Sequence, residues 1–170
     1  MTVISPSLRK AFTSNQTTNG FDTLIPKITE PSGDGVFDLW SRALGVGIDG
    51  HIPRYIDLIP YGTNADNETH NLRLWIWSKV VGEELWIPEL LLQLAVTLGN
   101  IDGSVIGTGV LMADTIAITY GDTAAPSTTN AADLTASILC HLRGCRYIQF
   151  DTDIGTGDAL NCFWRTMDQK

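Results

Sequence analysis

The sequence predicts an all-β fold: a single antiparallel β-sandwich or jelly-roll-like domain preceded by an extended N-terminal arm. Short apolar segments that alternate in period 2 recur along the chain, separated by clusters of Gly, Asn, Asp and Pro. No window carries a convincing 3.6-residue helical period. Leu90–Leu98 is the one serious helical rival, and the glycine-rich segment Gly99–Gly109 ends it. Many short strands with turn residues between them favour a sandwich or barrel.

Residues 1–35 differ from the rest of the chain. Thr13–Gly20 is a polar, low-complexity run, Glu30–Gly35 is dense in turn residues, and Leu24–Ile28 between them could form one short strand. We therefore divide the chain into an arm at residues 1–35 and a sandwich domain at residues 36–170. We expect the arm to be weakly ordered alone and to become ordered by docking on a neighbour.

Within the domain, short apolar segments bounded by turn residues predict the strands. Thr115–Tyr120 alternates most cleanly, with its three large side chains on one face. Residues 121–135 are small and polar and are predicted to form a surface loop. The predicted strands are Phe37–Ala43, Arg54–Ile59, Leu72–Val80, Leu90–Leu98, Thr115–Tyr120, Ala136–Leu142, Tyr147–Asp151 and Ala159–Thr166.

The segment Asn71–Leu98 is the most informative one, because it combines two alternating runs with three of the five tryptophans. Leu72, Leu74 and Ile76 share one face of the first run and are predicted to face a core. The opposite face carries aromatic and basic side chains, which are enriched where proteins meet. The predicted partner-contact residues are Arg73, Trp75, Trp77, Lys79 and Trp86.

Two other interpretations of these tryptophans stay open. Tryptophan is highly buried on average, so the sandwich could bury all three in its own core. Alternatively, an exposed tryptophan could form a platform for a sugar ring, since jelly-roll sandwiches include lectins.

Charge and cysteine content exclude several classes of function. The net charge is −8 and the pI is near 4.6, and the acids are spread along the chain. Because phosphate binding needs clustered Lys and Arg, we expect no nucleic-acid partner; the local group His141, Arg143 and Arg146 is too small to change that. Three cysteines, Cys140, Cys145 and Cys162, fit neither a zinc pattern nor an even disulfide framework and are predicted to be small buried hydrophobes.

The sequence contains neither a secretory signal nor an apolar run long enough to cross a bilayer. The start is polar, and the longest apolar stretch, Leu85–Leu98, is broken by Pro88, Glu89 and Gln93. We expect a soluble protein made in a cytoplasm, with no membrane partner.

No catalytic constellation is predicted, and neither a cofactor nor a metal site. Gly99–Gly109 lacks the Gly-Lys-Ser/Thr ending of a phosphate loop, and the three histidines are far apart in the sequence. Three carboxylates in Asp151–Asp158 could surround a calcium ion, but the EF-hand spacing fails, and such runs more often form hairpin turns.

Four segments share a pattern of apolar positions and turns: Tyr55–Gly62 (YIDLIPYG), Leu72–Lys79 (LRLWIWSK), Leu85–Leu91 (LWIPELL) and Leu94–Gly99 (LAVTLG). Together they resemble the small virion structural proteins of tailed bacteriophages. Later pieces agree with the same family: Ala113–Ile116 before a Gly-Asp turn, Ile148–Asp151, and Ala159–Trp164. The likeness covers about residues 54–168 and rests on apolar positions and turns.

The resemblance implies a structural protein of the virion, most plausibly a capsid decoration or cement protein. Such a protein would be synthesised in the host cytoplasm, bind the major capsid protein on the capsid surface and stabilise the head. It would be a compact β-fold and a homo-oligomer, with a trimer favoured. A tail or connector component and a carbohydrate-binding β-sandwich module are the alternatives.

Overall fold

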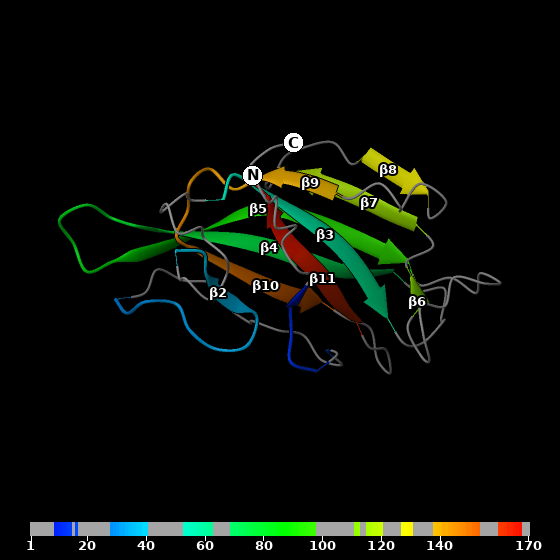
Figure 1. Cartoon of the computed structure of the whole chain (residues 1–170), viewed down its shortest axis with the longest axis horizontal. Coiled ribbons are helices and arrows are strands. Elements are labelled where there is room, and N and C mark those ends of the chain that lie inside the picture. Colours follow the sequence, from blue (N-terminus) through cyan, green and yellow to red (C-terminus); the bar gives the residue numbers. More distant parts are fainter. Residues whose placement is uncertain are drawn as a thin grey trace, which may run out of the picture.

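The all-β prediction is confirmed. A computed structural model describes residues 9–14, 16, 28–40, 53–62, 69–97, 111–112, 115–120, 127–130, 138–153 and 160–167. These residues contain strands and no helix, and the strands form two antiparallel sheets (Figure 1). The strands are β1 (Arg9–Lys10), β2 (Val36–Asp38), β3 (Tyr55–Gly62), β4 (Thr69–Lys79), β5 (Trp86–Thr97), β6 (Leu111–Met112), β7 (Thr115–Tyr120), β8 (Ser127–Asn130), β9 (Ile138–His141), β10 (Tyr147–Asp153) and β11 (Leu160–Met167).

The two sheets differ in size and share one core. The smaller sheet has the order β1-β11-β3-β6, with β9 also paired to β3, and the larger has the order β2-β10-β4-β5-β7-β8. Leu72 and Leu74 of β4 are at most 1% exposed, as the alternation predicts, and they share a cluster of buried residues with Ile56 and Leu58 of β3. The apolar faces of the two sheets therefore pack on each other.

The eight predicted strands overlap β2, β3, β4, β5, β7, β9, β10 and β11. The prediction of Phe37–Ala43 is wrong at Leu39 and Trp40, which form a turn after β2, and residues 41–43 lie outside the described residues. Three strands were not predicted: β1, β6 and β8. The prediction of a surface loop at 121–135 is wrong at Ser127–Asn130, because these residues pair with β7 as β8. Ser-Thr-Thr-Asn has no apolar alternation to reveal a strand, although threonine itself favours one. Gly99–Gly109 lies outside the described residues.

Parts of residues 1–35 belong to the sandwich. β1 pairs with β11, and the Ala11 N–H donates to the Cys162 carbonyl at 2.8 Å. Ala11 and Phe12 are 0% and 4% exposed, and the Asn161 side chain bonds both the N–H and the carbonyl of Phe12, each at 3.2 Å. The described residues of the expected arm are therefore ordered by this chain's own domain.

A bulge and a proline shape the β4–β5 pair. Leu74 is opposite Leu92 and Trp75 is opposite Leu90, so β5 contains one extra residue there. Further on, the Val80 N–H donates to the Leu85 carbonyl at 2.9 Å. Cross-strand pairs alternate between hydrogen-bonded and non-hydrogen-bonded, so the pair formed by Trp77 and Pro88 is of the second kind. The nitrogen of Pro88 thus faces away from β4, and the proline removes no hydrogen bond from this ladder.

Candidate interaction surface at the hairpin end

The β4–β5 hairpin extends past its neighbours in the sheet. The pairing of β10 with β4 ends at Trp77, and the pairing of β7 with β5 ends at Leu92. Among the described residues, the rest of the hairpin pairs only with itself, and it projects from the left of the molecule in Figure 1. Its turn uses Gly82 at φ 83° and leaves the Val81 side chain 98% exposed. We call residues 78–91, together with the residues that pack beside the base of the hairpin, the hairpin end.

Two of the predicted contact residues are buried. Trp77 and Trp86 lie on the face of the larger sheet that turns away from the core, as predicted, but they are only 0% and 3% exposed. They form a second small cluster with Tyr147, against which Val36 packs. The Trp77 indole N–H donates to Gln149 Oε1 at 2.7 Å. Of the alternatives left open by the sequence, burial within the chain is the one that applies to Trp77 and Trp86.

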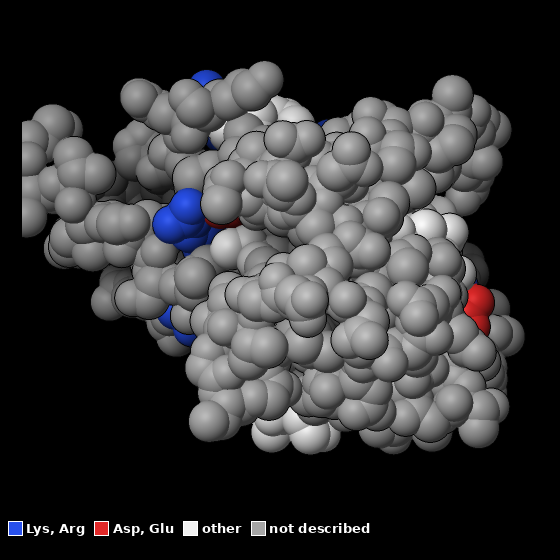
Figure 2. Space-filling model, turned by 90° about the vertical axis from the view of Figure 1, so that its right-hand side faces the viewer, with Lys and Arg blue, Asp and Glu red and all other residues white. Residues whose placement is uncertain are grey.

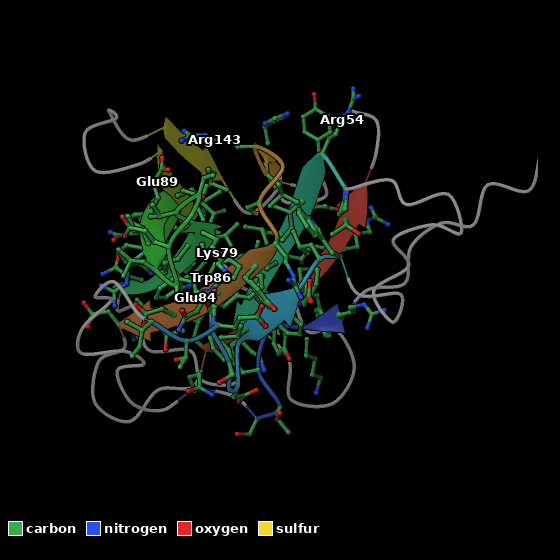
Figure 3. All side chains as sticks on the ribbon, turned by 90° about the vertical axis from the view of Figure 1, so that its left-hand side faces the viewer. Arg54, Lys79, Glu84, Trp86, Glu89 and Arg143 are labelled. Atoms are coloured by element: carbon green, nitrogen blue, oxygen red, sulfur yellow. The ribbon has the colours of Figure 1, made fainter. Side chains whose placement is uncertain are left out.

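Of the other three predicted contact residues, Arg73 and Trp75 are half-buried and Lys79 is exposed. Arg73 pairs with the buried carboxylate of Asp151 at 2.7 Å. Trp75 is half-buried, and its indole nitrogen has no hydrogen-bond partner. Lys79 bonds Glu84 across the hairpin at 3.2 Å and lies 6.0 Å from the centre of the Trp86 ring. Figure 3 shows Lys79, Glu84 and Trp86 together on the hairpin.

A hollow lies beside the base of the hairpin. Its volume is about 330 Å³. Trp40 on its wall is 50% exposed, which makes it the most exposed aromatic side chain of the hairpin end. Sequence reasoning missed Trp40, because a lone tryptophan after a short strand has no alternating neighbour to mark it. The lining residues are Glu30, Trp40, Trp77, Ser78, Lys79, Trp86, Gly144, Cys145 and Arg146.

Arg146 ties three segments together at this hollow. Its guanidinium lies 4.9 Å from the centre of the Tyr147 ring and 5.7 Å from that of Trp40, and it pairs with Asp38 at 3.0 Å and with Glu30 at 3.4 Å. The hydrogen bond to Asp38 raises the pKa of Arg146. Burial, followed by a 2.8 Å hydrogen bond to Glu30, raises the pKa of Tyr147 to about 12.

The basic residues noted in the sequence do not form a common patch. Arg143 pairs with Glu89 of β5, as Figure 3 shows, and the His141 ring packs edge-on against Tyr55 at 5.3 Å. The arginine pairs with an acid and the histidine ring packs against an aromatic ring. Figure 2 shows the other end of the sandwich, where basic and acidic side chains of the described residues are visible at opposite margins.

Elsewhere in the described residues, the sandwich encloses an aspartate and two cysteines. Asp57 of β3 is 0% exposed and accepts a hydrogen bond from Arg165 Nε at 2.8 Å. Burial raises the pKa of the Cys162 thiol, which is fully enclosed, so this cysteine is a poor nucleophile. Cys145 is buried as well; the side chain of Cys140 lies outside the described residues.

One of the three carboxylates that could bind calcium, Asp151, is already paired with an arginine. Asp151 lies in β10 and pairs with Arg73. Asp153 is exposed. Residues 154–159, which include the third carboxylate, lie outside the described residues. Within the described ranges there is no group of three or more His, Cys, Asp or Glu side chains that could hold a metal. In the same ranges, no helix is long and apolar enough to cross a membrane.

Comparison with known proteins gives no relative: no family model, no curated protein and no solved structure matches the chain.

Proposed function

We propose that this chain is a non-enzymatic virion structural protein of a tailed bacteriophage, a capsid decoration or cement protein that binds the major capsid protein. The resemblance of residues 54–168 supplies the virion context. The observation that carries the adhesive role is the hairpin end, which extends beyond the sandwich and exposes Val81 at 98% and Trp40 at 50%. Scattered exposed apolar residues are ordinary, but Trp40 lines a hollow beside the base of the same hairpin whose turn carries Val81.

Adhesion of this kind needs no chemistry. Removing apolar surface from water stabilises a contact by roughly 25 cal/mol per Å². Val81, Trp40 and Ile87, which is 42% exposed, supply such surface at one end of the molecule. A repeating shell presents many equivalent sites, so weak single contacts become effective when oligomers bind several at once. The resemblance favours a trimer.

The surroundings of the buried polar groups support the non-enzymatic part of the proposal. Asp57 is engaged by Arg165, Asp151 by Arg73, and Cys162 is enclosed with a raised pKa. A nucleophile, a base and an orienting group must lie within hydrogen-bond reach of one another and of a substrate. Asp57 and Cys162 lie in neighbouring strands of the smaller sheet and Asp151 in the larger one, and each of the two carboxylates is paired with an arginine.

Binding to capsid shells tests the proposal. Purified protein is mixed with shells of the phage that lack it, and co-sedimentation and the melting temperature of the shells are measured. We expect saturable binding, a more heat-resistant shell, and weaker binding by Trp40→Ala. Asp153→Ala, an exposed change at the opposite end of β10, should bind normally. Failure of the wild-type protein to bind shells would refute the cement role, and its location in a tail would support the connector or tail alternative.

A carbohydrate-binding role is a second candidate, because one half-exposed tryptophan lies at a hollow with both hydrogen-bond donors and acceptors. Trp40 provides an aromatic face, Glu30 an acceptor, and Lys79 and Arg146 donors. Trp40 is proposed as the platform because it is 50% exposed, whereas Trp77 is 0% exposed. A glycan array that gives no signal would exclude this role, whereas a signal lost in Trp40→Ala would support it.

A further inference from the structure

We propose that one side of the sandwich, between β11 and the turn before β2, is a peptide-docking site, and that residues 9–16 of the chain are the ligand it recognises. We call these residues the docked segment; all but residue 15 are described. The site adds an extended segment to the edge of the smaller sheet and selects an aromatic side chain within it. This inference does not depend on the capsid role, because the site and its ligand lie in one chain.

Backbone hydrogen bonds hold the docked segment as an added edge strand. β1 is the last strand of the smaller sheet and lies beside β11 (Figure 1). Beyond β1, the Ala11 N–H donates to the Cys162 carbonyl at 2.8 Å, and Gln16 exchanges hydrogen bonds of 2.8 and 3.0 Å with Leu160. When a domain binds a peptide by strand addition, such main-chain bonds supply affinity and side-chain pockets supply specificity. The docked segment therefore has the backbone contacts of a bound peptide.

One side chain of β11 takes the place of a strand partner for the docked segment. Asn161 Oδ1 accepts a hydrogen bond from the Phe12 N–H, and Asn161 Nδ2 donates one to the Phe12 carbonyl, each at 3.2 Å. The Asn161 side chain is fully buried. A buried amide that loses such partners keeps the full cost of its desolvation. Asn161 therefore favours a peptide backbone, with its N–H and carbonyl, as the occupant of this site.

The ring of Phe12 is buried between the two sheets. It packs edge-on against Phe150 of β10, with 6.4 Å between the ring centres, so a residue at the edge of the smaller sheet contacts the larger sheet. Gly35 provides room for the ring, because a Cβ added there would lie 2.9 Å from it. Aromatic side chains in closely fitting pockets carry much of the energy of recognition. Position 12 is therefore the anchor that the site selects.

The positions on either side of the anchor are also recognised. Ala11 is fully buried, so its position favours a small side chain. On the other side, the N–H and the hydroxyl of Thr13 donate to Asp34 Oδ1 at 3.1 and 3.0 Å. Asp34 adjoins Gly35, so one turn supplies both the acceptor and the room for the ring. The recognised peptide is therefore a small residue, an aromatic residue and a hydroxyl residue in succession.

The docked segment competes with any added peptide, because it is tethered to its own site. A tether of this kind gives an effective concentration in about the millimolar range, so a free peptide at about 10 μM does not displace the segment. Weakening the tethered segment while leaving Asn161, Asp34 and Gly35 intact should therefore make the site available. Replacing Phe12 in the full chain does this, since Phe12 belongs to the ligand and the other three residues belong to the site.

Fluorescence polarisation of a labelled peptide with the sequence of residues 7–18 tests the proposal. We expect saturable binding to the full chain that carries Phe12→Ala, and apparent binding about 100-fold weaker to the wild type, whose site is occupied. A peptide that itself carries Phe12→Ala should bind about 100-fold more weakly than the parent peptide, because it lacks the anchor. The matched control is a Ser14→Ala peptide, which should bind like the parent because Ser14 is exposed.

Stability measurements keep the test decisive if Phe12→Ala folds poorly. The peptide should raise the melting temperature of this variant, because a ligand that binds only the folded state stabilises it. Phe12→Leu, which keeps an apolar side chain at the anchor position, is the second variant and should bind the peptide less tightly than Phe12→Ala does.

Two results would overturn the proposal. One is a Phe12→Ala chain that neither binds the peptide nor gains melting temperature at peptide concentrations up to about 100 μM, which would far exceed the expected dissociation constant. The other is equal binding of the parent and Phe12→Ala peptides, because the anchor would then select nothing. Adding Asp34→Ala to the Phe12→Ala chain should weaken peptide binding about 10-fold, and unchanged binding would contradict the recognition of position 13.

Discussion

Replacing Phe12 by alanine tests whether the N-terminal segment is part of the sandwich. The ring is 4% exposed and lies edge-on to Phe150, with 6.4 Å between the ring centres. It also packs so close to Gly35 that a Cβ added there would lie 2.9 Å from it. Truncating a buried phenylalanine typically costs about 3–5 kcal/mol of unfolding free energy. For a domain of this size each kcal/mol lowers Tm by about 2–4 °C, so we expect Tm to fall by roughly 6–20 °C.

Urea unfolding followed by tryptophan fluorescence measures the change directly. The midpoint should fall while the slope stays near the wild-type value, because the same surface is exposed on unfolding. Ile28→Ala is the matched control, since Ile28 belongs to the same N-terminal segment and is 76% exposed; its effect should stay within about 0.5 kcal/mol. A loss below about 1 kcal/mol for Phe12→Ala would show that the segment is a dispensable arm.

Three further predictions follow from the described contacts. Gly35→Ala should destabilise the domain by about 1–3 kcal/mol more than Gly82→Ala in urea unfolding. Both glycines have positive φ, but a Cβ added at Gly35 would lie 2.9 Å from a backbone oxygen, whereas nothing lies within 4 Å of a Cβ added at Gly82. Equal losses of stability would contradict the close packing at Gly35. Tyr147 has a pKa raised to about 12, so ultraviolet titration should show a late tyrosine that Tyr147→Phe removes. Its proton is lost near pH 10 in the unfolded chain, so stability should fall as pH rises from about 10 to 12, and less so in Tyr147→Phe. Burial and its raised pKa should protect Cys162 from alkylation at pH 8 in the native protein but not in urea, as read by mass spectrometry; rapid native labelling would contradict its enclosure.

Local alternation was sufficient to predict the long strands. In β4 the period-2 pattern identified Leu72, Leu74 and Ile76 as core residues, because a strand with one buried face must repeat apolar side chains at every second position. Strands as short as β1 and β8 were missed. They lack room for a pattern, and their place is set by pairing with β11 and β7.

Alternation predicts the side of a sheet on which a residue lies but not what covers that side. Trp77 was placed correctly on the outward face, yet Tyr147 and Val36, distant in sequence, pack with it. Trp40 and Arg146 are likewise brought together from segments 106 positions apart, through a ring contact of 5.7 Å. The hollow at the hairpin end is therefore a product of long-range packing, which a single sequence does not reveal.

Electron cryomicroscopy of purified phage particles is the most direct test of the central claim. The account predicts density for a two-sheet sandwich on the outer surface of the capsid, in contact with the major capsid protein and with neighbouring copies of itself. Density for this chain in the tail or connector, or particles that do not contain the chain, would contradict it.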